Sequence, residues 1–145
     1  MDNKVKESRH ITLQNRQEDS TKLTDFLTDC ARAYAISDDV YNDLRLVVEE
    51  TFINIACYAF QDNETQTVTV ELNSTDDEIS ITFTDSGMAF NPLDHATDDI
   101  ANDDHCSGGM GIHIIRSLSD RQHYDRVGQT NVFTVTKHYT KANNE

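Results

Sequence analysis

A carboxylate and an amide lie one helical turn apart in the most apolar stretch of the chain, Leu44 to Phe60. Glu50 and Asn54 are four residues apart, so a helix places them on the same side, at the margin of its apolar face. A carboxylate in such a place is costly unless a cation, a metal ion or a hydrogen-bond donor meets it. We therefore expect this pair to face a ligand.

Two further stretches have the composition of a nucleotide pocket. Asp85-x-Gly87 directly follows a strand pattern, and Gly108 to Gly111 directly precede a helix pattern. Glycines before a helix let backbone amides approach phosphate oxygens, and the helix N-terminus adds partial positive charge. Each stretch alone is also typical of an ordinary turn. Together with the helix pair, they predict a site that binds a nucleotide.

The net charge of −14 restricts the ligands that the chain can hold. Nucleic acid and anionic lipid are repelled by it, so we expect no direct nucleic-acid partner and no membrane surface. A nucleotide is also an anion, and it needs a divalent cation or backbone amides to offset this charge. Mg²⁺ prefers oxygen ligands, and the amide oxygen of Asn54 provides one without adding an anion. Glu50, one turn earlier, could then act as a base.

The elements that must position these residues follow from apolar periodicity. A spacing of three and four residues predicts helices, with Ser20 and Ser37 as N-caps of the first two. A period of two predicts strands, four of which form two antiparallel hairpins. The expected order is strand 9–14, helix 20–36, helix 38–60, strand 65–72, strand 78–84, an acidic lid-like loop 93–107, helix 108–120, strand 121–127 and strand 131–138. Segregated helices and hairpins predict a two-layer α+β sandwich with a mostly antiparallel sheet.

The length of 145 residues suits one domain, which we place at 8–139 with flexible tails at 1–7 and 140–145. There is no signal-peptide pattern and no apolar run of about 18 residues, so we expect a cytoplasmic protein. The cysteines are odd in number and scattered, which predicts reduced thiols at Cys30 and Cys57. A metal site at His95, His105 and Cys106 is an alternative for the acidic loop, but this spacing matches no zinc pattern.

Three motifs in this order resemble the GHKL ATPases. VVEETFINIACYAF is similar to their Glu-x-x-x-Asn box, DSGMAFNP to their Asp-x-Gly-x-Gly-type adenine box, and GGMGIHIIRSLSD to their second glycine box. The likeness is strongest to bacterial anti-sigma factors that are also serine/threonine protein kinases, and it covers nearly the whole chain. It implies a Bergerat-type ATP-binding fold with a mixed, mostly antiparallel sheet.

The resemblance also implies a role for each matching position. Asn54 would be a Mg²⁺ ligand, Glu50 the general base, and Asp85 the acceptor of the adenine amino group. Gly87 would allow close approach of the base, and Ala89 stands beside it where a second glycine or a proline is usual. The remaining implied contacts are to the phosphates, from Gly108, Gly109, Met110 and Gly111, and to a water beside the adenine, from Thr134.

The function implied is transfer of the ATP γ-phosphoryl group to a serine of an anti-anti-sigma (STAS-type) partner by a protein that also binds a sigma factor. A homodimer is expected from the likeness alone. The lid has no Lys or Arg, and Tyr58 stands where these kinases often have His. These departures favour an alternative, an ATP-dependent regulatory protein-binding module with little or no kinase activity.

Two other hypotheses belong to different classes. A histidine-kinase ATPase module detached from its sensor is disfavoured, because we find no upstream His-bearing dimerisation helix in the sequence. In a purely structural interpretation, Glu50 and Asn54 bond only to neighbouring backbone. Binding of Mg-ATP would exclude that interpretation.

Overall fold

The computed structural model describes residues 7–59, 66–94 and 110–139. Its elements follow the order expected from the sequence, with two short 3-10 turns in addition. They are β1 (Glu7–Gln14), η1 (Gln17–Asp19), α1 (Ser20–Ala33), α2 (Asp38–Tyr58), β2 (Thr67–Ser74), β3 (Glu78–Asp85), η2 (Pro92–Asp94), α3 (Met110–Leu118), β4 (Arg121–Val127) and β5 (Thr130–His138).

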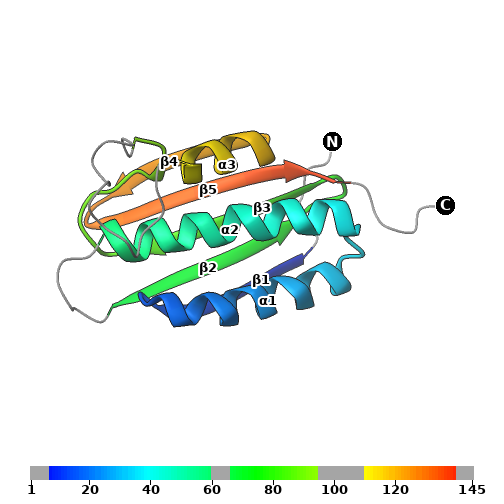
Figure 1. The fold of residues 1–145 in the computed structure, drawn as a ribbon, viewed down its shortest axis with the longest axis horizontal. Helices are drawn as coiled ribbons and strands as arrows, with labels where there is room; N and C mark the ends of the chain where they lie inside the picture. Colours follow the sequence, from blue (N-terminus) through cyan, green and yellow to red (C-terminus); the bar gives the residue numbers. More distant parts are fainter. Residues whose placement is uncertain (1–6, 60–65, 95–109, 140–145) are drawn as a thin grey trace.

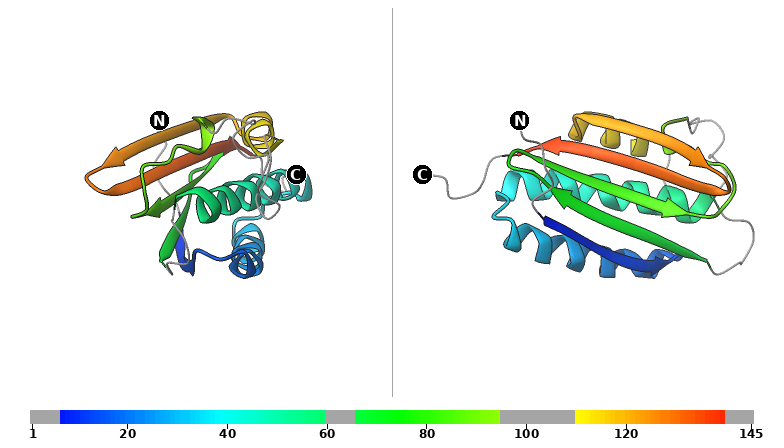
Figure 2. Two further views of the ribbon diagram at one scale, coloured as in Figure 1. Left: turned by 60° about the vertical axis from the view of Figure 1, so that its left-hand side comes forward. Right: turned by 180° about the vertical axis from the view of Figure 1, so that it is seen from behind.

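The five strands form one sheet in the order β1-β2-β3-β5-β4, and each neighbouring pair is antiparallel. Helices α1, α2 and α3 cover one face of this sheet, with α2 between the other two (Figures 1 and 2). The described chain is therefore a two-layer α+β sandwich, with one layer of helices on one antiparallel sheet. This confirms the fold class predicted from the sequence.

The core lies between these two layers because alternate strand residues point toward the helices. In β3 the buried positions are every second residue, and they end with Asp85 at the last position. The largest fully buried side chains come from α1, α2, α3 and four of the strands; they are Phe52, Phe83, Phe133, Leu13, Leu23, Leu27, Leu44, Ile55, Leu72, Ile79, Ile81 and Ile115.

Local geometry at the helix ends confirms one capping prediction and corrects another. The Ser37 side chain accepts a hydrogen bond from the Val40 N–H at 3.4 Å and begins α2, as expected. Ser20 is instead the first residue of α1, because the 3-10 turn before it places Asp19 at the N-cap position. Helix α1 ends at Ala33 rather than Ile36, because Ala35 has a φ of 57° and turns the chain out of the helix.

The cysteine prediction holds at one position and fails at another. Cys30 is a free, buried thiol, whereas Cys57 is disulfide-bonded. None of the helices in the described ranges combines the length and the apolar character needed to cross a membrane. The acidic loop, its His95, His105 and Cys106, and both terminal tails beyond residues 7 and 139 lie outside the described residues.

Candidate functional site

Helix α2 presents the predicted Glu50 and Asn54 pair one turn apart, with different degrees of burial. Asn54 is 1% exposed, whereas Glu50 is half-buried. The Asn54 Oδ1 atom is buried and accepts no hydrogen bond from any described residue. Buried polar atoms are nearly always paired, and an unmet acceptor costs free energy. This oxygen therefore has the burial and chemistry that suit a bound cation.

A Mg²⁺ ion fits this position on chemical grounds. The ion takes oxygen ligands and keeps several of its waters, so a single neutral amide oxygen with a carboxylate one turn away is a suitable protein contribution. Within the described residues there is no group of three or more His, Cys, Asp or Glu side chains placed to hold a metal by themselves. Water and the phosphates of a nucleotide are oxygen ligands that would suit the remaining positions of such an ion.

Asp85 ends β3 and points toward the helical layer, where it is 4% exposed. Its Oδ1 atom accepts two hydrogen bonds, from the Gly87 N–H at 2.8 Å and from Asn131 Nδ2 at 3.0 Å. Burial raises the pKa of Asp85 above its ordinary value, while these two hydrogen bonds and the charge of Arg126 act in the opposite direction. A buried carboxylate at a strand end is suited to accept a hydrogen bond from a ligand.

The loop after Asp85 is packed against the C-terminal end of α2. The Met88 N–H donates to the Ala59 carbonyl at 2.6 Å, and the Tyr58 and Phe90 rings lie 5.8 Å apart between centroids. A Cβ atom on Gly87 would lie 2.2 Å from the same Ala59 oxygen, so only glycine fits. The structure thus gives a packing reason for Gly87, and its predicted role toward a nucleobase stays a prediction.

Asn131 is the residue of this site that the sequence reasoning missed. It is 2% exposed and opposes Asp85 directly in the pairing of β3 with β5. Besides its bond to Asp85, its Nδ2 donates to the Met88 carbonyl at 2.7 Å. A signal was present in the sequence, since Asn131 shares the strand parity of the apolar Phe133 and Val135.

The structure does not bring Thr134 into this cluster. Its hydroxyl lies 3.1 Å from that of Thr82, its partner across β3 and β5. Thr82 alternates with the inward-facing residues of β3, so both threonines point away from the helical layer that Asp85 faces. Thr134 thus lies on the other strand face from Asp85, and its role toward an adenine-side water stays a prediction.

The second glycine stretch is described only in part. Gly108 and Gly109 lie outside the described residues, Met110 begins α3, and Gly111 is buried in the first turn of that helix. Helix α3 packs on α2, and its Arg116 donates to the Leu93 carbonyl at 3.3 Å, in the turn that follows the Asp85 loop. Ala89 is exposed on this loop. The phosphate-binding role of 108–111 stays a prediction.

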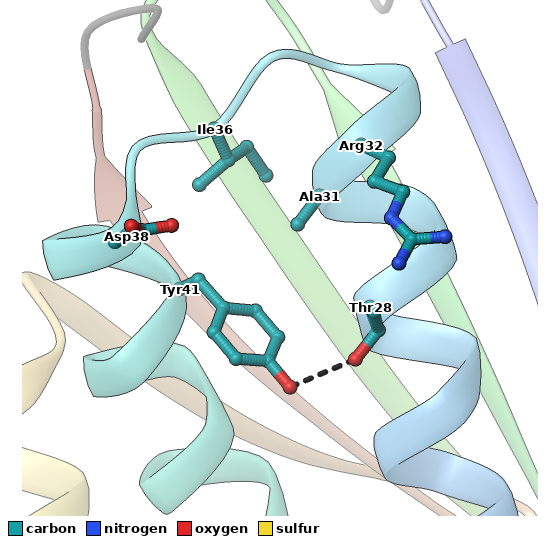
Figure 3. Close-up of a pocket in the computed structure, with 6 residues that line it drawn as sticks. All are labelled: Thr28, Ala31, Arg32, Ile36, Asp38 and Tyr41. Atoms are coloured by element: carbon teal, nitrogen blue, oxygen red, sulfur yellow. Dashed lines mark hydrogen bonds between the residues drawn. The ribbon is translucent and has the colours of Figure 1, made fainter.

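Two cavities lie between α1 and α2, outside the cluster of polar residues around Asp85. One, of about 220 Å³, surrounds a 2.8 Å hydrogen bond between the Thr28 and Tyr41 hydroxyls (Figure 3). It lies at the N-terminal end of α2, more than two helical turns before Asn54. The other, of about 270 Å³, is lined by Ser20, Thr21, Thr24, Asp25, Glu49 and Ile53. Neither contains Glu50, Asn54 or Asp85.

Comparison with known proteins gives matches over most of the chain. The family model described as the histidine kinase-like ATPase domain matches residues 13–137. Serine/threonine-protein kinase BtrW of Bordetella bronchiseptica is 29% identical over 97 residues, which are 66% of this chain and 68% of that protein. The solved RsbU and RsbW domains of Rv1364c from Mycobacterium tuberculosis superpose with a TM-score of 0.68 at 11% identity. That match covers 95% of this chain and 35% of the solved one, and it establishes the fold alone.

Proposed function

Because this chain belongs to the family of histidine kinase-like ATPase domains, we propose that it is an ATP-binding anti-sigma factor and serine/threonine protein kinase. Its protein substrate in this proposal is a serine of an anti-anti-sigma (STAS-type) partner, and its second partner is a sigma factor. The name of the Bordetella relative supports the reaction class. The observation that carries the proposal is the buried, unpartnered Asn54 Oδ1 one turn from Glu50.

Each element of the site has a task in this reaction. Asn54 would hold Mg²⁺, and the bound ion would neutralise charge on the phosphates of ATP. Asp85 accepts the adenine amino group, and the residues at the start of α3 receive the phosphates. Glu50 accepts the proton of the substrate serine as its oxygen attacks the γ-phosphorus and ADP departs. We expect the protein and both partners to meet in the cytoplasm.

The kinase assignment is tested with γ-labelled ATP, Mg²⁺ and a serine-bearing STAS-type protein. We expect label on the partner with the wild-type protein and a loss of about 100-fold or more in its rate with Glu50→Gln. Glu49→Gln is the matched control, since Glu49 is next in the sequence but ion-paired with Arg45 at 3.2 Å. Equal labelling by Glu50→Gln and wild type would disprove the role of Glu50 as base.

A second measurement separates nucleotide binding from transfer. We expect Mg²⁺ to tighten ATP binding by the wild-type protein and to have little effect on Asn54→Ala. If wild type binds Mg-ATP but labels no partner, the alternative of a regulatory protein-binding module without kinase activity is correct. If Asn54→Ala keeps the full response to Mg²⁺, Asn54 is not the metal ligand.

A further inference from the structure

Behind Asp85 lies a polar cluster that the proposed reaction does not use. It consists of Asn131 on β5 and of Tyr124 and Arg126 on the neighbouring β4. The Asn131 Oδ1 atom accepts hydrogen bonds from the Tyr124 hydroxyl, from Arg126 Nη1 at 3.1 Å and from the Phe90 N–H at 3.2 Å. Three donors on one oxygen hold the amide in a single orientation.

This orientation decides which group faces Asp85. With its oxygen turned to the three donors, Asn131 must present Nδ2 to Asp85 Oδ1 and to the Met88 carbonyl. The opposite amide orientation would place oxygen against two acceptors and nitrogen against the Arg126 and Phe90 N–H donors, so the network excludes it. Asn131 therefore donates to Asp85 and fixes the plane of its carboxylate.

Arg126 adds a positive charge to the same cluster. Its Nη1 atom donates to the Gly87 carbonyl at 2.9 Å as well as to Asn131. Arg126 is the charged side chain that acts on Asp85 among the described residues, and it favours the ionised carboxylate. The Tyr124 hydroxyl is linked to Asp85 through Asn131. Burial is the largest influence and leaves the pKa of Asp85 raised, and the hydrogen bonds from Asn131 and Gly87 and the charge of Arg126 limit that rise.

The protonation state of Asp85 determines which nucleobase it can bind. An ionised carboxylate only accepts hydrogen bonds, whereas a protonated one also donates. Adenine offers an amino group at the position where guanine has a carbonyl oxygen. An ionised Asp85 thus suits adenine and opposes guanine, and a protonated Asp85 accommodates either base.

We propose that Asn131 and Arg126 are specificity-determining residues, which restrict this site to adenine nucleotides by holding Asp85 as an oriented, ionised carboxylate. The inference rests on the proposed function, in which Asp85 receives the base. Neither residue is required to touch the nucleotide. Both act through Asp85, so they are positioning residues rather than catalytic ones.

The test is the ratio of GTP to ATP dissociation constants, measured on the full chain with Mg²⁺ between about pH 5 and pH 8. Near pH 7 we expect wild type to prefer ATP by about ten-fold or more, since a carbonyl facing a carboxylate leaves two acceptors unpaired. Arg126→Gln and Asn131→Asp should reduce this preference toward unity by weakening ATP and strengthening GTP. In wild type the preference should fall only at low pH, and in Arg126→Gln it should fall at higher pH.

Two control variants separate specificity from general damage. Arg126→Lys keeps the charge and should retain most of the preference for ATP. Arg121→Gln removes an arginine from the same strand that pairs with Glu78 instead, and should leave the ratio unchanged. A merely structural role would weaken ATP and GTP equally and leave the pH profile in place. An equal loss of affinity for ATP and GTP with an unchanged pH profile would overturn the inference. If Asn131→Asp does not fold, this result in Arg126→Gln alone is sufficient.

The outcome also distinguishes this inference from the function on which it rests. If wild type does not bind ATP, or if Asp85→Asn leaves both constants unchanged, the proposed nucleotide site itself is wrong. If Asp85→Asn changes the ratio while Arg126→Gln does not, the site stands and only the roles of Arg126 and Asn131 are disproved.

Discussion

Replacing Gly87 with alanine tests the packing of the Asp85 loop on α2. The added Cβ would lie 2.2 Å from the Ala59 oxygen and 2.9 Å from its carbonyl carbon, where real Cβ contacts essentially never fall below 3.0 Å. The obstructing atoms are backbone at the end of a helix, so they cannot swing aside as a side chain would. The loop itself must move by nearly 1 Å.

The cost of this movement follows from the contacts that it disturbs. Moving Gly87 away from Ala59 stretches the 2.6 Å bond from the Met88 N–H, and with it the 2.8 Å bond from Gly87 to Asp85. Overpacking costs about 1–3 kcal/mol and each weakened hydrogen bond about 1 kcal/mol. We expect the free energy of unfolding of Gly87→Ala to fall by about 2–3 kcal/mol. Because the loop holds Asp85, we also expect ATP affinity to fall by about ten-fold.

Urea unfolding followed by circular dichroism measures the first effect, and calorimetric titration with Mg-ATP measures the second. Gly128→Ala is the matched control, because Gly128 has a φ of +63° in the β4-β5 turn and has open space around its Cβ position. It should lose about 1 kcal/mol through backbone strain and bind ATP as wild type does. An unfolding midpoint and an ATP affinity for Gly87→Ala equal to those of wild type would refute the steric reasoning.

Three other changes have expected outcomes. Ala35→Gly should raise the free energy of unfolding by about 1 kcal/mol, because alanine at a φ of 57° is strained. Ala33→Gly, in the last turn of α1, is the control and should lower the free energy of unfolding by about 0.5 kcal/mol. A lower free energy of unfolding in both variants would contradict this reasoning. Burial raises the pKa of Asp19, but its bond from the Gln14 N–H and nearby cations outweigh burial and hold it below its ordinary value. The ionised form of Asp19 therefore stabilises the fold above about pH 4, and this stabilisation is lost as pH falls. Asp19→Asn should lower the thermal midpoint by roughly 4 °C near pH 7 and much less at pH 2. An equal decrease at both pH values would contradict this reasoning. Burial raises the pKa of Cys30 to about 11, so iodoacetamide at pH 8 should label this thiol only after unfolding, and rapid labelling of the folded protein would show that it is accessible.

The arrangement of helices and strands was predictable because burial imposes its period on the sequence. Strands β2 and β3 bury every second residue, and their alternation is visible in the sequence alone. The placement of Glu50 and Asn54 on one side of a helix was also predictable, since it depends only on the repeat of that helix. The left-handed conformation of Ala35 was not predictable, because such a position usually selects glycine and alanine gives no such signal.

The polar cluster shows where local patterns stop being informative. Asn131 is 46 residues from Asp85, and the bond between them depends on how β5 pairs with β3. That register is set by the whole sheet and by the packing of its apolar face. Thr134, which the family likeness implied, lies on the other strand face from Asn131. Asn131 shares the parity of the apolar Phe133, so its inward direction was visible in the sequence although its partner was not.

Helix α2 links the two ends of the proposed site. Asn54 lies five residues before Ala59, a rise of about 7.5 Å along a regular helix. Ala59 holds the Asp85 loop through Met88, so the spacing between the amide oxygen and this loop is set by helical backbone hydrogen bonds. A helix keeps such a spacing more rigidly than a loop does. In the proposed site, a substitution such as Gly87→Ala would therefore misplace a bound nucleotide relative to Asn54 without touching either, because it would shift the proposed base position while α2 and the proposed metal ligand stay in place.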